Sequence, residues 1–336
     1  MLANKPHTAM THAKRHLILL LLLSLGSLLR GQDIHFSQVD ADPLLLNPAY
    51  TGFYNGMGRF GAIYRNQWVT VSIPYQTLAL TGELAVWRSN TQHSGFSMGA
   101  SFFSDHAGSL HYGSTSAHLS AAYFFALNRR GNNYLSFGVE GGYAQSGFDP
   151  SAALMEDPSE LFPSQQTHYP LLAAGVAWYY QPSGDFHTRI GFSVRNINRP
   201  NISYMQLDNT RLLPRYSLTL HAEYRHWQSC SLMPVLLLQM QGEHREFVYG
   251  TDFKWYLMEG GHHEVSLRAG VAFRQADALI ANLLVEYDAF LFNFCYDANI
   301  SGLATASHGI GAFELGLVYR LSKGSKKTKA LKCQPY

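Results

Sequence analysis

Histidine and aspartate are the side chains of this protein whose types could support acid–base or metal chemistry. The 336 residues include 16 histidines, and Asp105 and His106 stand next to each other, superficially like a protease dyad. The His-Glu-x-x-His spacing of zinc peptidases does not occur, and His262, His263 and Glu264 fall in an expected turn. Neighbouring residues at a strand end point to opposite faces, so Asp105 and His106 would need other partners. We therefore predict no catalytic residue, no metal site and no cofactor, and interpret the protein as non-enzymatic.

The cysteines do not indicate a disulfide framework or a metal site. Cys230, Cys295 and Cys333 are scattered too widely for a disulfide framework or a metal knuckle. We interpret Cys295 as a small residue of a sheet and Cys333 as a thiol of the C-terminal tail.

The first 31 residues resemble an export signal. Lys14, Arg15 and His16 form a positive region, and an almost continuous apolar stretch follows from 17 to 29. This stretch is too short for a spanning helix and fits a cleaved signal peptide, with the cut expected near Gly31. No cysteine lies nearby, so a lipoprotein anchor is not expected.

Charge and composition exclude a nucleic-acid partner. Removal of residues 1–31 takes away four basic residues and no acidic residue, which leaves 21 basic and 23 acidic residues. The mature chain therefore has no global basic field. Charged residues make up only 14% of the chain and aromatic residues 13%, a balance that suits a surface exposed to lipid.

The elements that would position these residues are strands. Between 133 and 147, for example, apolar Phe137 and Val139 alternate with Ser136, Gly138 and Glu140. A period of two places the two sets on opposite faces of a sheet. Because this pattern follows an export signal and contains no second long apolar segment, we predict an all-β fold, a transmembrane antiparallel β-barrel of the bacterial outer membrane.

The number of such runs supports a closed barrel. About fourteen segments fit, an even number as bacterial barrels require: 57–70, 76–88, 94–105, 109–126, 133–147, 169–181, 187–197, 215–227, 232–241, 246–257, 263–274, 278–287, 290–298 and 309–321. If both barrel ends face the periplasm, the long connections 148–168, 199–214 and 299–308 all fall outside, and short turns such as 128–132 and 183–185 fall on the periplasmic side. The chain then divides into a signal peptide (1–31), a pre-barrel segment (32–56), the barrel (57–321) and a basic tail (322–336).

Aromatic residues cluster near the predicted strand ends, where rings with one wet edge form girdles at the membrane interfaces. An alternative is that aromatic residues simply favour strands. The cluster comprises Tyr64, Trp68, Trp87, Trp178, Tyr180, Tyr224, Trp227, Trp255, Tyr256, Tyr287 and Tyr319.

Charged residues of both signs fall in the polar phase of the strands and should face the lumen. Mixed signs suit a network of ion pairs or a partly plugged bore better than a filter of one sign. The alternative is that they only solvate a wet interior. The sequence does not separate these interpretations, and we prefer simple solvation. The residues are Glu83, Glu140, Arg189, Arg195, Glu223, Arg225, Arg268, Arg274, Glu286, Asp297, Glu314 and Arg320.

Two motifs near the start of the barrel are more specific than the strand pattern. The first contains Asn47, Pro48, Tyr50 and Gly52 in the order Asn-Pro-Ala-Tyr-Thr-Gly, where turn-forming residues flank an aromatic side chain. The second consists of Tyr64, Arg65, Asn66, Gln67 and Trp68. The first segment could dock against the barrel, and both motifs are candidate sites for partner docking.

The order and spacing of these motifs resemble the PorP/SprF family of type IX secretion system outer-membrane proteins of Bacteroidota. Further matches extend the resemblance over nearly all of the mature chain: Asp105-x-x-Gly108, Leu213-Pro214 with Tyr216, Tyr296-Asp297 and Glu314 with Tyr319. The resemblance implies a non-enzymatic barrel that supports secretion, gliding, or surface attachment of proteins with C-terminal sorting domains. Its implied partners are outer-membrane lipid, a secreted adhesin or cargo C-terminal domain, and periplasmic type IX secretion lipoproteins.

Two alternatives stay open beside this one. The strand pattern alone fits a passive porin or a channel for hydrophobic solutes, and the spare histidines leave a barrel enzyme as a weaker alternative. The basic tail, which contains Lys323, Lys326, Lys327, Lys329 and Lys332, fits a disordered end, or a segment that attracts an acidic periplasmic partner.

Overall fold

The protein is described here from a computed structural model. The residues that the structure describes are 36–38, 43–54, 56–67, 74–89, 91, 93–108, 112–148, 166–204, 210–259, 263–302 and 304–321. The predicted signal peptide, the predicted basic tail and Trp68 lie outside these residues.

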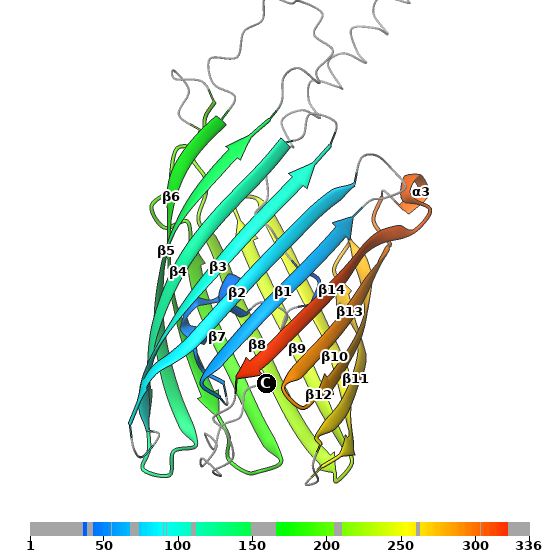
Figure 1. Ribbon diagram of the computed structural model, residues 1–336. Coiled ribbons are helices and arrows are strands. Elements are labelled where there is room, and N and C mark those ends of the chain that lie inside the picture. Colours follow the sequence, from blue (N-terminus) through cyan, green and yellow to red (C-terminus); the bar gives the residue numbers. More distant parts are fainter. Residues whose placement is uncertain are drawn as a thin grey trace, which may run out of the picture. The chain divides into compact units, whose positions relative to one another are not determined.

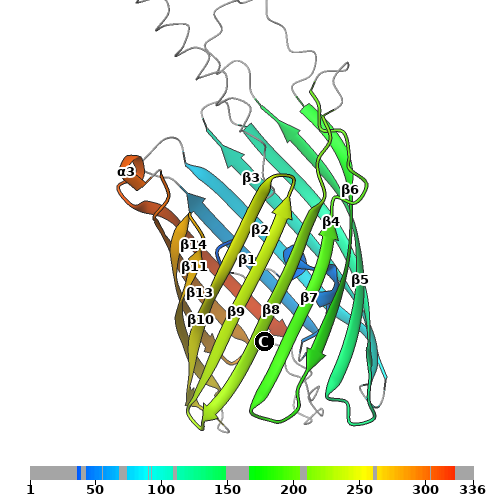
Figure 2. The same cartoon turned by 180° about the vertical axis from the view of Figure 1, so that it is seen from behind.

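Fourteen antiparallel strands form one closed barrel (Figures 1 and 2). Each strand pairs with its neighbours in sequence, and β1 pairs with β14 along ten residue pairs, from Gly58 with Leu321 to Gln67 with Ala312. The strands are β1 (Gly58–Gln67), β2 (Tyr75–Arg88), β3 (Ser94–Ala107), β4 (Tyr112–Ala126), β5 (Asn133–Gly147), β6 (Gln166–Tyr180), β7 (Phe186–Arg195), β8 (Arg215–Trp227), β9 (Cys230–Gln241), β10 (His244–Met258), β11 (Val265–Arg274), β12 (Ala278–Tyr287), β13 (Phe290–Asn299) and β14 (Ile310–Leu321).

The structure confirms the predicted barrel and its fourteen strands. It also confirms that the long connections lie at one end of the barrel, because the β5–β6, β7–β8 and β13–β14 connections follow odd-numbered strands. We call this the long-loop end, and the opposite end the short-turn end. The short α3 (Ala304–Ser307) lies in the last long connection.

Alternation separates the two faces of the wall as the sequence predicts. On β5, Phe137 and Val139 are 50% and 61% exposed, whereas Ser136 and Glu140 are buried. The exposed apolar side chains face outward, and the buried polar side chains face the lumen. Such a wall satisfies its backbone groups between strands, which is what a hydrocarbon environment demands. Within the described residues, no helix is long and apolar enough to cross a membrane.

Most of the aromatic residues expected in a girdle face outward at strand ends. At the short-turn end, Trp87, Tyr224, Trp227 and Tyr287 are exposed. Tyr256 departs from the expectation, because its hydroxyl group donates a hydrogen bond to the carboxylate of Glu223 inside the lumen. Its position in the inward phase of β10 explains this difference.

Residues 36–38 and 43–54 lie inside the barrel. They contain a single helical turn, α2 (Pro43–Leu46), and a 3-10 turn, η1 (Pro48–Tyr50). Both are visible in blue between the walls in Figure 1. We call these two stretches, 36–38 and 43–54, together the inner segment. Leu44, Ala49, Tyr50 and Tyr54 are each at most 1% exposed, so the segment forms part of the core.

The outward face of β5 gives a direct test of membrane exposure. Val139→Arg places a charge near the middle of the lipid-facing band and should lower the free energy of unfolding by about 2–4 kcal/mol. Gln145→Arg, on the same face near the strand end, should cost at most about 1 kcal/mol. Unfolding by urea in lipid vesicles, followed by tryptophan fluorescence, measures both values. Equal costs at the two positions would contradict a membrane-spanning β5.

Candidate functional site in the lumen

The two described stretches of the inner segment contact the wall toward opposite ends of the barrel. Ser37 contacts Arg65, which is two residues from the end of β1 on the long-loop side. The carbonyl oxygens of Gly52 and Tyr54 accept hydrogen bonds from Arg88, the last residue of β2 at the short-turn end. The chain therefore runs from the long-loop end toward the short-turn end before β1 begins.

The turn at the centre of the segment is encoded locally. The Asn47 side-chain oxygen accepts a hydrogen bond from the Ala49 N–H at 2.9 Å, which caps η1, and Pro48 occupies the first turn, where its missing N–H costs nothing. Thr51 closes the turn by donating its hydroxyl to the Pro48 carbonyl at 2.8 Å. Gly52 follows with φ +71°, and a Cβ there would lie 2.0 Å from the Ser97 side chain, so only glycine fits.

Glycines of the barrel wall make room for this turn. A Cβ at Gly175 would lie 2.0 Å from the Asn47 side-chain oxygen, and a Cβ at Gly191 would lie 2.1 Å from the Tyr50 hydroxyl. At Gly138 of β5, a Cβ would meet the Pro48 carbonyl at 2.3 Å. These glycines lie in the inward phase of β5, β6 and β7, so the wall is shaped to the motif.

Hydrogen bonds fix the same turn to the wall. The Asn47 side-chain amide donates to the carbonyl oxygens of Val176 at 3.0 Å and Phe192 at 3.3 Å. Ser136 donates to the Ala49 carbonyl at 2.7 Å, and Ser193 donates to the Leu46 carbonyl at 2.5 Å. Backbone carbonyl groups of the segment thus have hydrogen-bond partners away from water. This removes the free-energy cost of burying them unpaired.

Aromatic rings complete the anchor of the turn. The Phe53 ring stacks on Tyr179 with 3.5 Å between centroids and meets Phe124 edge-on at 5.1 Å. The guanidinium of Arg189 lies 4.4 Å from the centre of the Tyr50 ring, within cation–π range. Burial of these rings adds hydrophobic stabilisation to the hydrogen bonds.

Charged groups of the lumen hold both ends of the segment. At the short-turn end, Glu83 accepts a hydrogen bond from the Gly52 N–H at 2.6 Å and pairs with Arg59. At the long-loop end, Ser37 lies in a cluster of buried charges. Its hydroxyl group contacts Asp297, Arg65 and Arg274 at 2.5–2.7 Å, and Glu314 accepts the Ser37 N–H at 2.6 Å.

Between the two ends, Arg195 connects the segment to a third buried group. It donates to the carbonyl oxygens of Leu44 at 3.2 Å and Leu45 at 3.1 Å, and it pairs with Glu140. His118 lies 3.0 Å from the same carboxylate. These contacts distribute the anchoring over strands on opposite sides of the lumen.

The preferred interpretation of the lumen charges as simple solvation was wrong. Of the predicted lumen residues, Glu140, Arg195, Arg268, Asp297 and Glu314 are all nearly inaccessible and all form ion pairs. The bore contains the inner segment, so water cannot solvate these groups and opposite charges must do so. Arg225 differs, because it lies at the short-turn rim and pairs with the exposed Glu259.

The second motif is divided between the two faces of β1. Arg65 faces inward and joins the Ser37 cluster, and Gln67 accepts a hydrogen bond from it at 3.3 Å. Tyr64 and Asn66 face the other way, where the Asn66 amide lies 3.3 Å from the Tyr64 hydroxyl. Arg65 thus contacts the inner segment at Ser37, which lies outside the first motif. Whether the motif residues dock a partner stays a prediction.

Several residues that hold the inner segment were not singled out from the sequence. Ser37 and Arg88 belong to this group, as do the glycines Gly138, Gly175 and Gly191. A glycine at an inward position of several neighbouring strands is the signal that could have indicated a bound segment, since such glycines otherwise weaken a strand.

The residues considered for catalysis do not gather into a site. Asp105 is half-buried and accepts a hydrogen bond from Thr77 at 2.5 Å, whereas His106 is exposed on the other face of β3. Gly95 to Gly99 has the Gly-x-Ser-x-Gly spacing of a nucleophile elbow. Ser97 nevertheless lies within β3, with its side chain packed against Gly52, and not at a strand-to-helix turn. Among the described residues, no three histidine, cysteine or acidic side chains are placed to hold a metal ion.

One histidine outside the lumen has a clear partner. His263, in the connection between β10 and β11, lies 2.7 Å from Asp288 in the neighbouring turn. This hydrogen bond, together with one from the Glu264 N–H, lowers the pKa of the Asp288 carboxyl group. The pair ties two exposed turns together.

A comparison with protein families identifies the chain. The family described as "Type IX secretion system membrane protein PorP/SprF" matches residues 29–319. No protein in a search of curated proteins matches.

One solved structure shows the same fold at low identity, and others are similar. A deletion mutant of the TodX monoaromatic hydrocarbon channel has a TM-score of 0.51 at 9% identity, over 82% of this chain and 93% of that chain. The toluene transporter TbuX of Ralstonia pickettii has a TM-score of 0.48 at 10% identity, over 83% and 93% of the two chains. At these identities, the similarity concerns the architecture alone.

The Ser37 cluster predicts a large cost for the loss of its central cation. Arg65→Met leaves the buried Glu314 with an uncompensated charge, so the free energy of unfolding should fall by about 3–5 kcal/mol. Arg225→Met removes an exposed pair and should cost at most about 1 kcal/mol. Urea unfolding of both variants in lipid vesicles compares the costs. Similar small effects would show that the cluster contributes little to the stability of the barrel.

Proposed function

Because the chain belongs to the PorP/SprF family of type IX secretion system membrane proteins, we propose that it supports the secretion or surface attachment of proteins with C-terminal sorting domains. In this proposal the barrel lies in the outer membrane, with its short-turn end toward the periplasm. It performs no enzymatic step. The family match over residues 29–319 is the observation that carries the proposal.

The geometry of the lumen supports a scaffold more than a conduit. The inner segment is bonded to strands on both sides of the bore, from Arg65 and Arg274 to Arg195 and Ser193. An exported folded protein could not pass without breaking these contacts. We therefore propose that partners bind at the two ends: a cargo C-terminal domain at the long-loop end, and lipoproteins of the secretion system at the short-turn end. A role in gliding would follow where the cargo is a surface adhesin.

Deletion of the gene tests this function. Proteins with C-terminal sorting domains should accumulate in the periplasm or disappear from the cell surface, and the wild-type gene should restore them. Cell fractionation and surface labelling measure the distribution. Unchanged secretion and surface attachment in the deletion strain would reject the proposal.

A passive porin or a channel for hydrophobic solutes is the second candidate function. The inner segment argues against it, because a segment bound in the bore obstructs conduction. Purified wild-type protein should show little ion conductance in planar bilayers. Combined Asn47→Ala and Tyr50→Ala substitutions remove the side-chain bonds that fix the central turn, so they should raise the conductance by releasing part of the segment. Gly141→Ala is a matched control, because this glycine faces outward, and a Cβ there meets only Leu172 at 3.9 Å. A high conductance of the wild type, equal to that of the double variant, would favour the channel.

A further inference from the structure

The turn between β4 and β5, at the short-turn end of the barrel, carries two adjacent arginines. Arg129 and Arg130 occupy its two central positions, between Asn128 and Gly131, and both are exposed. The Gly131 N–H donates to the Asn128 carbonyl at 3.3 Å, and Gly131 has φ +62°. Asparagine at the first position and glycine at the fourth position are typical of such a turn.

Hydrogen bonds hold this turn in one position. The Asn128 side chain donates to the Asn132 side chain at 2.7 Å. The turns on either side are bonded to it as well. The Ala126 N–H donates to the His93 carbonyl at 2.6 Å, and the Gln181 N–H donates to the Asn132 carbonyl at 2.8 Å. The arginines are therefore presented from a fixed backbone, which reduces the entropy lost when a ligand binds.

Neither arginine is neutralised by a carboxylate in the described part of the chain. Arg129 and Arg130 form no ion pair there, and Asp185 of the neighbouring β6–β7 turn pairs with neither of them. Two like charges at adjacent positions repel each other, so an anion placed between them would stabilise both.

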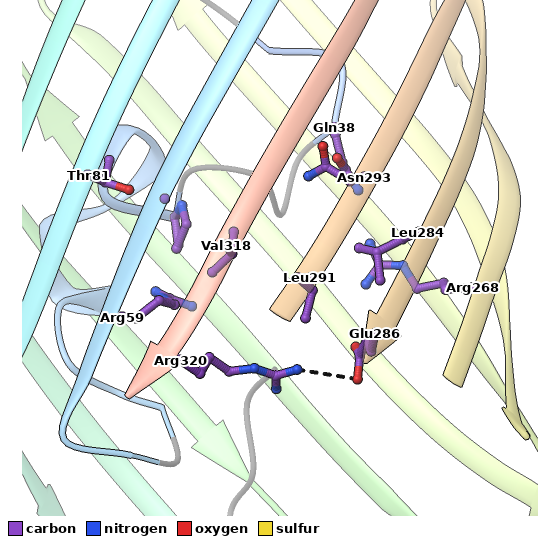
Figure 3. A pocket seen from close by; sticks show the side chains of 12 residues that line it. Gln38, Arg59, Thr81, Arg268, Leu284, Glu286, Leu291, Asn293, Val318 and Arg320 are labelled. Atoms are coloured by element: carbon purple, nitrogen blue, oxygen red, sulfur yellow. Dashed lines mark hydrogen bonds and ion pairs between the residues drawn. The ribbon is translucent and has the colours of Figure 1, made fainter. Parts of the chain in front are cut away.

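Arginines inside the barrel differ in this respect. Arg320 pairs with Glu286, as Figure 3 shows. Arg59, on the strand next to Arg320, pairs with Glu83. The lack of an acidic partner among the described residues thus distinguishes the arginines of the β4–β5 turn from these arginines of the lumen.

The outward face of the wall is apolar up to the first residue of this turn. Leu127, directly after β4, is 49% exposed, and Tyr123 and Phe125 precede it on the same face. Arg129 follows two residues later, at most about 7 Å farther along the chain. The headgroup layer of a membrane extends about 5–7 Å beyond the hydrocarbon core on each side. The two arginines therefore lie at the level of the lipid phosphates.

Aromatic rings on a neighbouring strand mark the same level. Trp178 and Tyr180 of β6 stack with 5.4 Å between their ring centroids. The Trp178 indole N–H donates to the Asn133 side chain at 2.7 Å, at the start of β5. Rings with one polar edge prefer the membrane interface. A lipid held at the arginines would have its glycerol region close to these rings.

We propose that the β4–β5 turn binds the headgroup phosphate of an anionic phospholipid, with Arg129 and Arg130 as the phosphate contacts. A guanidinium group forms two parallel hydrogen bonds with a phosphate group, and basic side chains at a membrane surface are attracted to anionic lipid. The level of the turn favours a lipid over an acidic protein partner, because lipid phosphates already lie beside it. This inference does not rest on the proposed role in secretion.

Lipid binding to the full mature protein in detergent micelles tests the proposal. The probes are phosphatidylglycerol, which is anionic, and phosphatidylcholine, which has the same phosphate but no net charge. Native mass spectrometry measures the fraction of protein that retains each lipid. The wild type should bind phosphatidylglycerol at least tenfold more tightly than phosphatidylcholine, and equal affinities would overturn the proposal. So would glycerol phosphate that displaces phosphatidylglycerol at equal concentration, since the site would then bind a free anion.

Substitutions assign the contact. Arg129→Gln combined with Arg130→Gln should weaken the binding of phosphatidylglycerol about 25-fold, about fivefold for each basic residue. Arg129→Lys with Arg130→Lys keeps both charges and should keep most of the preference. Both double variants should unfold at the temperature of the wild type, because the replaced side chains are exposed.

Arg225→Gln is the matched control. Arg225 lies at the same end of the barrel but pairs with Glu259, so its loss should leave the preference for phosphatidylglycerol unchanged. Unchanged binding by the double glutamine variant, or an equal loss in Arg225→Gln, would reject the site. Binding of hexa-aspartate that depends on Arg129 and Arg130, without a preference for phosphatidylglycerol, would assign the turn to an acidic protein partner and reject the lipid.

Discussion

The closed ladder of backbone hydrogen bonds is the constraint on which the structure depends. Hydrocarbon offers no partner for an N–H or a carbonyl group, so a spanning sheet must have no free edge. Pairing of β1 with β14 along ten residue pairs meets this demand. Closure also creates an interior, and because the inner segment lies in it, the buried charges there need partners.

The inner segment supplies part of what these charges need. Arg65 and Arg274 would be costly in a narrow bore by themselves, and Asp297 and Glu314 neutralise them. The Ser37 hydroxyl group and N–H fill the remaining hydrogen-bonding positions of this cluster. The same groups thus stabilise the wall and hold the segment, so the segment is part of the folded core.

The sequence predicted the barrel well because lipid imposes a strict rule on each strand. A polar residue at an outward position is costly, so the alternation on β5 or β11 is easy to recognise, and the predicted bounds of most strands are correct within a few residues. The even number of predicted strands also indicated which connections lie at which end of the barrel. Family motifs indicated which part of the pre-barrel segment would dock, and Asn47, Pro48, Tyr50 and Gly52 all lie in the lumen.

The lumen was harder to predict, since no single rule governs it. An inward glutamate such as Glu83 can contact water, an arginine or a backbone N–H, and its position in the strand does not distinguish these cases. Tyr179 and Phe124 occupy inward positions, where polar residues were expected. Their aromatic rings are accommodated there because Phe53 of the inner segment packs on them. Partners that are distant in sequence, such as Ser37 and Glu314, cannot be paired without the fold.

The position of the inner segment ahead of β1 has a consequence for biogenesis. Its turn fits against Gly138, Gly175 and Gly191 with no space for one additional carbon atom, and contacts around the bore enclose it. Threading it through a finished cylinder would require all these contacts to form through a narrow opening. A simpler order of events is that β5–β7 first assemble around the turn, and that the last strand then joins the first. In that order, the inner segment serves as a template against which the strands of the wall assemble.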